Sequence, residues 1–265
     1  MNITSYAPGR FSWAEVATPD AVGSTAFYTA LLGLAAGDVQ VGEGDPYTIL
    51  NKNGHYVCGL YGMSAEDMQR VSGGRAVWRA YFTVADADQA LKRVGDLGGT
   101  VIHEPIAIGT DGRVAVAQDP TGATFSMWEP GDHHGAQVLG EPGALTWAEL
   151  YTRDTQAASS FYGGLFGWTS STVPSPAGGE YTLFQLDGQE AAGMMGMHEE
   201  WGPMPPHWAV YFDVADLDDA RTRAGGLGGG EVMPPMQVEG VGRFAFLQDP
   251  QGGVFAVIQP EQREG

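Results

Sequence analysis

The sequence contains a single cysteine, Cys58, and no cysteine pair at the spacing of a metal knuckle. An intramolecular disulfide is therefore excluded, and a reducing compartment fits this composition. Long apolar runs are also missing. Stretches such as YVCGLYGM are far shorter than a membrane span, and the opening MNITSYAPGR lacks the charged-then-apolar layout of a signal peptide. These absences predict a soluble cytoplasmic protein.

Basic residues are scarce as well. Lysine and arginine total 13 against 32 aspartates and glutamates, which gives a formal net charge of −19 at pH 7. Most of such a surface would repel a nucleic acid. The acidic residues are scattered, which is typical of a solvated surface, although the same charge would attract a cationic small molecule. We therefore expect a small-molecule partner and no nucleic-acid or membrane partner.

What the sequence does contain is an internal repeat. The segment WAEVATPDAVGSTAFYTALLG at 13–33 recurs as WAELYTRDTQAASSFYGGLFG at 147–167, which is 134 positions later. Two further segments, 78–101 and 112–130, recur at 208–232 and 242–260. Such repetition predicts a duplicated unit of about 130 residues. The Gly- and Pro-containing segment 131–143 between the two copies is typical of a linker.

Each copy divides again by its local pattern. A strand-like alternation is followed by a helix that we expect to begin at Asp20 and to stop at Gly33. The second quarter repeats this order, with a helix that opens near Asp86 or Asp88 and closes at Gly98-Gly99. Short strands follow each helix. The pattern predicts four βαβββ modules, at residues 10–63, 77–130, 144–197 and 207–260.

Three motifs occur in both halves. They are D-x-x-x-[STA]-x-x-F-Y-x-x-x-[LF]-G at 20–33 and 154–167, V-A-D-x-D-x-A before a Gly-Gly pair, and Q-D-P-x-G before the last strand. Together they resemble the vicinal oxygen chelate superfamily, which includes glyoxalase I, extradiol dioxygenases and bleomycin-resistance proteins. The subtype most similar to this chain is the tandem glyoxalase-like protein, often labelled a hydroxylase.

The resemblance covers nearly the whole chain and implies an α+β fold. Four βαβββ modules would form two glyoxalase-like, cup-shaped domains in tandem, at residues 1–130 and 144–265, joined by the linker 131–143. Helices would cover the outside of each cup. The sequence leaves open which modules pair, and it allows either a monomer or a homodimer.

The resemblance also locates where a metal would be bound. Relatives with metal chemistry place His and Glu ligands on the inner face of the first and last strand of a module. The corresponding residues here are Trp13, Gly59, Arg79 and Ser126 in the first half, and Trp147, Gly193, Ala209 and Ala256 in the second. Arginine cannot coordinate a cation, and glycine and alanine offer no donor. We expect no metal and no other cofactor, although His133-His134 in the linker could bind metal adventitiously.

Strand alternation then predicts what lines the cups instead. The expected ligand-binding residues are Trp13, Tyr61, Arg79, Tyr81, Ser126, Trp128, Trp147, Met195 and Tyr211. Such a lining suits a flat, mostly apolar molecule, although any single aromatic residue would also be explained as ordinary core. We expect Gly59 and Gly193 to keep the floor of each cup open.

Glu15 and Glu149 are the hardest inward residues to explain as packing. A carboxylate in a partly apolar cup must be paired, protonated or used. Arg79 is the expected partner of Glu15, and Glu149 would need backbone amides, a hydroxyl or Arg153. Both glutamates are candidate general bases or hydrogen-bond acceptors, and a structural pair is an equal alternative.

Three functional hypotheses follow. The first is a metal-free binding protein of the bleomycin-resistance type that sequesters an aromatic or amphipathic metabolite. The second is a metal-independent lyase, isomerase or hydroxylase-like enzyme with Glu15 or Glu149 as general base. The third is a divalent-metal glyoxalase or dioxygenase with displaced ligands. Arg79 and Ser126, opposed to Ala209 and Ala256, suggest that the two halves bind different molecules or that only the first is active.

Overall fold

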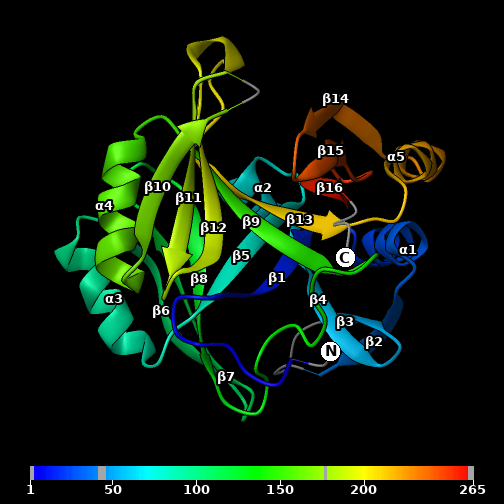
Figure 1. Ribbon diagram of the computed structural model, residues 1–265. Coiled ribbons are helices and arrows are strands. Elements are labelled where there is room, and N and C mark those ends of the chain that lie inside the picture. Colours follow the sequence, from blue (N-terminus) through cyan, green and yellow to red (C-terminus); the bar gives the residue numbers. More distant parts are fainter. Residues whose placement is uncertain (1–2, 41–45, 176–177, 262–265) are drawn as a thin grey trace.

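The structure, a computed structural model, describes residues 3–40, 46–175 and 178–261 and contains two eight-stranded sheets that meet back to back (Figure 1). The outermost residues of the two expected domains, 1–2 and 262–265, lie outside the described residues. The predicted α+β fold with two tandem cup-shaped units is confirmed.

Both halves follow the predicted strand–helix–strand–strand–strand order twice. The first half consists of β1 (Phe11–Thr18), α1 (Ala21–Leu32), β2 (Ala35–Val39), β3 (Tyr47–Lys52), β4 (His55–Gly62), α2 (Ala65–Ser72), β5 (Val77–Thr83), α3 (Ala87–Asp96), β6 (Thr100–Ile108), β7 (Gly112–Gln118) and β8 (Thr124–Pro130). The second consists of β9 (Leu145–Thr152), α4 (Thr155–Phe166), β10 (Thr169–Pro174), β11 (Glu180–Leu186), β12 (Gln189–Gly196), the 3-10 helix η1 (Glu199–Trp201), β13 (His207–Asp213), α5 (Leu217–Gly226), β14 (Gly230–Val238), β15 (Gly242–Gln248) and β16 (Val254–Pro260). Helix α2 is an addition that the sequence pattern did not predict.

Strand order shows which modules pair. The first sheet runs β2-β3-β4-β1-β5-β8-β7-β6 and the second runs β10-β11-β12-β9-β13-β16-β15-β14. The two modules of one half therefore join through their first strands, β1 with β5 and β9 with β13, both antiparallel. Each cup is built from two consecutive modules, which the sequence had left open.

The helix boundaries follow from the capping residues that the sequence offers. Asp20 accepts a hydrogen bond from the backbone N–H of Gly23 at 2.9 Å, and Asp86 accepts one from that of Gln89 at 2.9 Å. Gly33 ends α1 in the left-handed conformation at φ 69°, as predicted. Helix α3 ends at Asp96 with Leu97 as its C-cap, and the predicted stop at Gly98 follows directly in the left-handed conformation, at φ 84°.

Helices α1, α3, α4 and α5 lie on the convex faces of the sheets and form the two flanks of the molecule (Figure 1). Helix α1 packs beside α5 of the other half, and α3 packs beside α4, so that one helix pair flanks each side of the contact between β5 and β13 (Figure 1). The rings of Phe82 and Trp208 meet across this contact with centroids 4.8 Å apart. One continuous apolar core therefore joins the two halves.

A buried hydrogen-bond chain crosses between the halves twice. Tyr28 of α1 donates to Asp249 at 2.6 Å and accepts from Nε1 of Trp78 at 2.8 Å. The second half repeats this arrangement, since Tyr162 bonds to Asp119 at 2.9 Å and accepts from Trp208 at 2.8 Å. Both aspartates belong to the repeated Q-D-P-x-G turn. The F-Y motif of each half thus anchors the turn of the other.

Cys58 is fully buried in the core, and burial raises the pKa of its thiol. Among the described helices, none has the length and apolar character needed to cross a membrane.

We expect Tyr28→Phe to lower the free energy of unfolding by about 1–3 kcal/mol, because it leaves a buried carboxylate oxygen of Asp249 and the indole N–H of Trp78 without their partner. Chemical denaturation measures this change. Ser160→Ala, which removes an exposed hydroxyl on α4, is the control and should change stability by less than about 0.5 kcal/mol. Equal stabilities of Tyr28→Phe and the parent would contradict the role assigned to this crossing.

Candidate functional site

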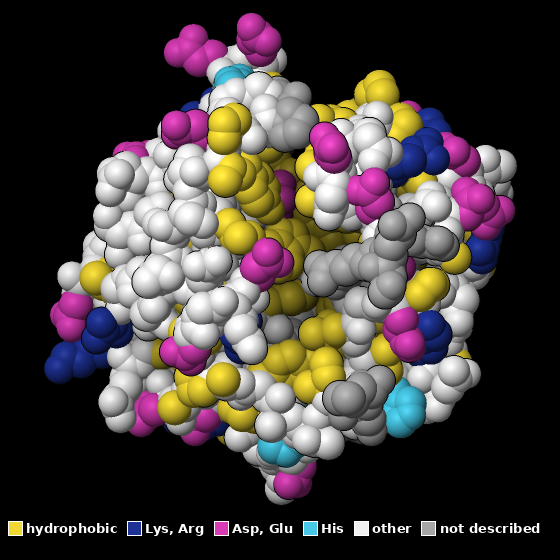
Figure 2. Space-filling view, viewed as in Figure 1, with side chains coloured by type: hydrophobic (Ala, Val, Ile, Leu, Met, Phe, Trp, Pro, Cys, Tyr) yellow, Lys and Arg dark blue, Asp and Glu magenta, His cyan; other side chains and the backbone are white. Residues whose placement is uncertain are grey.

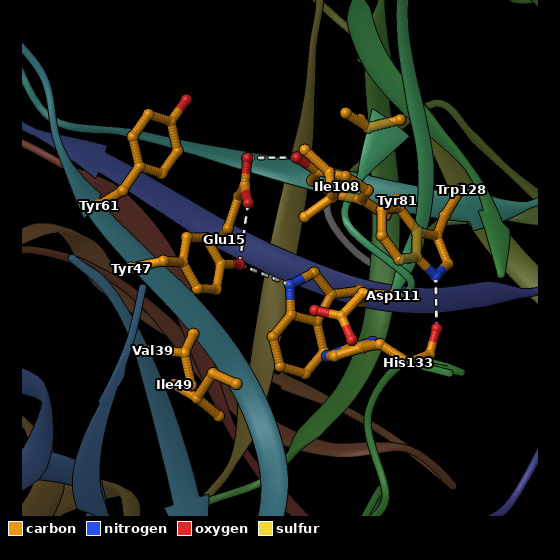
Figure 3. A pocket seen from close by; sticks show the side chains of 12 residues that line it. Glu15, Val39, Tyr47, Ile49, Tyr61, Tyr81, Ile108, Asp111, Trp128 and His133 are labelled. Carbon is orange, nitrogen blue, oxygen red and sulfur yellow. Dashed lines mark hydrogen bonds between the residues drawn. The ribbon is translucent and has the colours of Figure 1, made fainter. Parts of the chain in front are cut away.

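The first cup contains a buried carboxylate, Glu15, held by two tyrosine hydroxyls. Tyr47 of β3 donates to Oε2 at 3.0 Å, and Tyr81 of β5 donates to Oε1 (Figure 3). Tyr47 in turn accepts a hydrogen bond from Nε1 of Trp13 at 3.0 Å. Trp13 and Glu15 lie two residues apart on β1, so both point into the cup, as predicted. Both carboxylate oxygens therefore have a donor, and each keeps a lone pair for a further one.

Glycine makes this arrangement possible. Gly59 of β4 lies beside Glu15 in the sheet, and a Cβ atom at this position would stand 1.7 Å from the hydroxyl oxygen of Tyr47. The tyrosine reaches across the glycine to the carboxylate. The expectation that Gly59 keeps the floor of the cup open is therefore wrong, because the Tyr47 side chain occupies that space.

The charge of Glu15 is balanced within the cup. Burial raises the pKa of Glu15, whereas the hydrogen bond from Tyr81, the positive charge of Arg79 and the hydrogen bond from Tyr47 lower it, and the net shift is upward. Arg79 lies directly opposite Glu15 on β5. Its side chain hydrogen-bonds with Tyr61 and interacts with Glu15 through its charge. The expected pairing of Arg79 with Glu15 is thus electrostatic.

A cavity of about 220 Å³ opens above this cluster. Its lining is mostly apolar and aromatic and comprises Trp13, Glu15, Val39, Tyr47, Ile49, Tyr61, Tyr81, Ile108, Asp111, Val114, Trp128 and His133 (Figure 3). Of the six predicted binding residues in this half, four line the cavity, namely Trp13, Tyr61, Tyr81 and Trp128, and the candidate base Glu15 lines it as well. Arg79 is partly exposed and does not line the cavity, and Ser126 is fully buried beside Tyr81. Within the described part of the chain, Oγ of Ser126 has no hydrogen-bond partner.

His133 is a cavity residue that sequence reasoning placed in the linker. Its ring meets Trp13 edge to face at 4.7 Å, and its Nδ1 accepts a hydrogen bond from the backbone N–H of Gly135 at 3.1 Å. Burial lowers the pKa of His133, so the neutral ring carries its proton on Nε2. Segment 131–143 packs on the first half, with the N–H of Ala136 bonded to the carbonyl of Ser12 at 2.7 Å. His133 has no counterpart in the second half, so no signal in the sequence indicated that it would line the cavity.

The second cup repeats the carboxylate cluster. Tyr181 of β11 donates to Oε2 of Glu149 at 2.9 Å, and Tyr211 of β13 donates to Oε1 at 3.2 Å. Trp147 bonds to Tyr181 at 3.2 Å, as Trp13 does to Tyr47. Gly193 is the counterpart of Gly59, since a Cβ there would lie 1.9 Å from the hydroxyl of Tyr181. The expectation of an open floor at Gly193 is wrong for the same reason.

Arg153 is not the partner of Glu149. Its guanidinium donates to the carbonyl oxygens of Gly202 at 2.5 Å and Met204 at 3.3 Å, in the segment after η1. The pKa of Glu149 is raised by burial and lowered by hydrogen bonds from Tyr151, Tyr181 and Tyr211, with a net upward shift. Hydroxyls therefore satisfy this carboxylate, which was one of the three alternatives.

Tyr47 and Tyr181 are the principal residues that sequence reasoning missed. They lie 134 positions apart, which is the spacing that relates Trp13 to Trp147 and Glu15 to Glu149. The repeat therefore held a signal that would have found them. The other predicted residues of the second cup, Met195 and Trp147, pack on the inner-face apolar cluster that contains Tyr211.

The donor set of the cups does not fit a divalent ion. The described residues contain no group of three or more His, Cys, Asp or Glu side chains close enough to share a metal. In the first cup Glu15 is bonded to two tyrosines, and the ring nitrogen Nδ1 of His133 is engaged with the backbone. Tetrahedral or octahedral metal sites need at least three such donors converging on one point.

Comparison with known proteins gives relatives along the whole chain. The family model described as the glyoxalase/bleomycin resistance protein/dioxygenase superfamily matches residues 10–127 and 144–257. CFP32 of Mycobacterium tuberculosis, provisionally named a glyoxylase, is 33% identical over 262 residues, with 98% of each chain covered. The anthracycline biosynthesis protein DnrV of Streptomyces peucetius is 34% identical over 275 residues, which cover 99% of this chain and 97% of DnrV.

Solved structures show the same fold. The Mn(II)-bound glyoxalase from Novosphingobium aromaticivorans superimposes with a TM-score of 0.64 at 16% identity, and the match covers 95% of this chain and 82% of that one. The dioxygenase LapB from Pseudomonas sp. KL28 superimposes with a TM-score of 0.63 at 15% identity, covering 98% and 94%. At such identities the likeness concerns the fold alone.

Gly59→Ala should displace Tyr47 from Glu15 and lower the free energy of unfolding by about 1–3 kcal/mol, since the new methyl group would overlap the tyrosine hydroxyl. Thermal denaturation tests this. The control is Gly37→Ala on β2, where a Cβ atom meets nothing within 4 Å. If both variants lose the same stability, Tyr47 does not depend on the glycine.

Glu149→Gln should be more stable than the parent protein at neutral and mildly alkaline pH. The folded-state pKa of Glu149 lies above the ordinary value of 4.5, so the folded protein binds more protons than the unfolded chain between these two pKa values. This carboxyl therefore lowers the free energy of unfolding as pH rises through that window. The advantage of Glu149→Gln should vanish below pH 4.5, where both states are protonated. Chemical denaturation across a pH series measures this difference, with the exposed Glu66→Gln as control. A Glu149→Gln protein that is less stable than the parent at neutral pH would contradict the prediction.

Proposed function

We propose that this chain, which belongs to the glyoxalase/bleomycin resistance protein/dioxygenase superfamily, binds and sequesters a flat aromatic or amphipathic small molecule in the first cup without a metal ion. The observation that carries this proposal is the cavity of about 220 Å³, whose walls are aromatic and aliphatic and whose polar groups gather at Glu15. Binding sites for small organic molecules combine such an apolar wall with a few polar groups that orient the ligand.

The polar groups define what the ligand would offer. Glu15 accepts from two tyrosines and keeps free lone pairs, so a ligand hydroxyl can donate to it. Trp13 and Trp128 give the cavity flat walls, and such walls favour aromatic rings. The relative DnrV is named an anthracycline biosynthesis protein, and anthracyclines are fused-ring phenols. A hydroxylated polycyclic aromatic compound therefore fits both the chemistry of the cavity and this relative.

Net charge supports the same kind of partner. A chain with a formal charge of −19 would repel a polyanion, whereas an uncharged aromatic molecule meets no such barrier. The cavity also excludes most of the solvent from Glu15, which is only 8% exposed. A hydrogen bond from a ligand hydroxyl to this carboxylate would gain strength from that exclusion.

The proposal is tested with quinizarin, a dihydroxyanthraquinone, by titration calorimetry. Val114→Phe introduces the residue that the second half has at the equivalent position, Phe244, so the variant should fold while the larger ring fills the cavity. We expect at least tenfold weaker binding, equivalent to about 1.4 kcal/mol. Val22→Phe, the same substitution at a position of α1 that is 83% exposed, is the control. Equal affinity in Val114→Phe and Val22→Phe would refute binding in the first cup.

A second candidate rests on the raised pKa of Glu15, which moves this carboxyl toward the range of a general base. In this alternative the first cup is the site of a metal-independent lyase, isomerase or hydroxylase-like enzyme, and Tyr81 stabilises a developing oxyanion. Glu15→Gln separates the two candidates with the same dye. Turnover that disappears in Glu15→Gln while affinity persists favours the enzyme, and absence of turnover in the parent favours sequestration.

Metal analysis of protein purified without a histidine tag tests the metal-free part of the proposal. We expect substoichiometric divalent metal, because the described residues bring no three His, Cys, Asp or Glu side chains close enough to share an ion. Near-stoichiometric Mn, Fe, Ni or Zn would overturn both candidates and restore the third hypothesis, a glyoxalase or dioxygenase with displaced ligands.

A further inference from the structure

The second cup differs from the first in the residue opposite its carboxylate. Arg79 faces Glu15 across the β1–β5 pair, whereas Ala209 faces Glu149 across the β9–β13 pair. Glu149 is only 6% exposed, and in the described residues no lysine or arginine forms an ion pair with it. His207 stacks on Tyr151 at 5.3 Å, but burial keeps this imidazole neutral by lowering its pKa. The second cup therefore contains a buried carboxylate without a compensating cation.

Aromatic rings surround this carboxylate. Tyr181 and Tyr211 donate to it, and Tyr151 hydrogen-bonds with Tyr211 at 3.0 Å. Phe246 meets both Tyr151 and Tyr211 at centroid distances of 5.8 Å. The faces of such rings attract a cation when it approaches them.

The cluster forms the apolar wall of an open hollow. Its residues belong to an inner-face group that is separate from the core between the sheets, and Trp147, Met195, Phe244 and Ile258 on its edge are only partly buried. Figure 2 shows hydrophobic side chains gathered in a hollow between the two arms of the second sheet, over β9 and β13. A ligand can enter this hollow from solvent.

The segment that packs on Tyr151 carries two exposed glutamates, which outnumber the single arginine that binds it. The ring of Trp201 in η1 contacts that of Tyr151, with centroids 5.9 Å apart. Arg153 donates hydrogen bonds to backbone carbonyl oxygens of the segment that follows η1. Glu199 and Glu200 precede Trp201 and are exposed. Acidic groups at the mouth of a pocket raise the local concentration of cations.

We propose that the second cup is a separate site for a lipophilic organic cation, an ammonium group on an apolar or aromatic body, with the ammonium beside Glu149 and among Tyr151, Tyr181 and Tyr211. The first cup would not share this preference, since Arg79 already neutralises Glu15 and would repel an ammonium group. The two cups of one chain then take ligands of different charge. A carboxylate that burial destabilises regains favourable electrostatics when such a cation binds.

The test compares phenyltrimethylammonium with its neutral isostere, tert-butylbenzene, by titration calorimetry on the full chain at low ionic strength. We expect the cation to bind at least tenfold more tightly than the isostere, because only the cation gains the charge interaction with Glu149. Glu149→Gln should weaken cation binding about tenfold or more and change binding of the isostere less than twofold. Equal affinity of the two probes for the parent protein would overturn the proposal.

Two further variants keep the result interpretable. Ala209→Arg supplies the counterpart of Arg79 and should abolish cation binding while Glu149 is retained. Glu66→Gln removes an exposed carboxylate of α2 and serves as the matched control for net charge, with an expected change below twofold. If Glu149→Gln and Ala209→Arg leave cation binding intact, or if Glu15→Gln alone removes it, the cation lies elsewhere and the proposal is wrong. Quinizarin binding in the first cup does not enter this comparison, so either proposal can fail alone.

Discussion

The back-to-back packing of two curved sheets is the constraint on which the rest of this structure depends. Each sheet has a convex face that must be buried, and one apolar core with two helix pairs covers both faces at once. The hydrogen bonds from Tyr28 to Asp249 and from Tyr162 to Asp119 cross between the halves inside that core. Buried polar pairs of this kind specify one relative orientation, because a shift would leave a carboxylate unpaired. Neither sheet therefore covers the concave face of the other.

On each concave face the same local arrangement recurs. A tryptophan and a glutamate lie two residues apart on the central strand, and a tyrosine from a strand further out reaches the glutamate across a glycine. Hydrogen bonds from tyrosine hydroxyls offset part of the cost of burying the carboxylate. One difference between the cups, Arg79 against Ala209, decides whether the carboxylate has a cation opposite it.

Relatives of this fold include a Mn(II)-bound glyoxalase, and the cups of this chain lie on the same framework. The positions that the family resemblance assigns to metal ligands hold Trp13, Gly59, Arg79 and Ser126 in the first half. Among them Trp13 forms part of an aromatic wall, Gly59 leaves room for the hydroxyl of Tyr47, and Arg79 places a positive charge near Glu15. The same fold can therefore carry different side chains at the metal-ligand positions. Its function must be argued from the side chains in each cup.

The sequence by itself determined the repeat, the four modules and the helix cap at Asp20, and it narrowed the start of α3 to Asp86 or Asp88. It also determined the inward direction of Trp13, Glu15, Tyr61, Tyr81 and Trp128. All of these follow from local rules, since capping and strand alternation act over a few residues. Tertiary structure alone decided that Tyr47 and Tyr181 cover Gly59 and Gly193. It also decided that His133, within the linker segment, lines the first cavity, and that Arg153 points away from Glu149. These outcomes depend on contacts between segments that are distant in the chain, where strand order and packing, rather than local pattern, set which side chains meet.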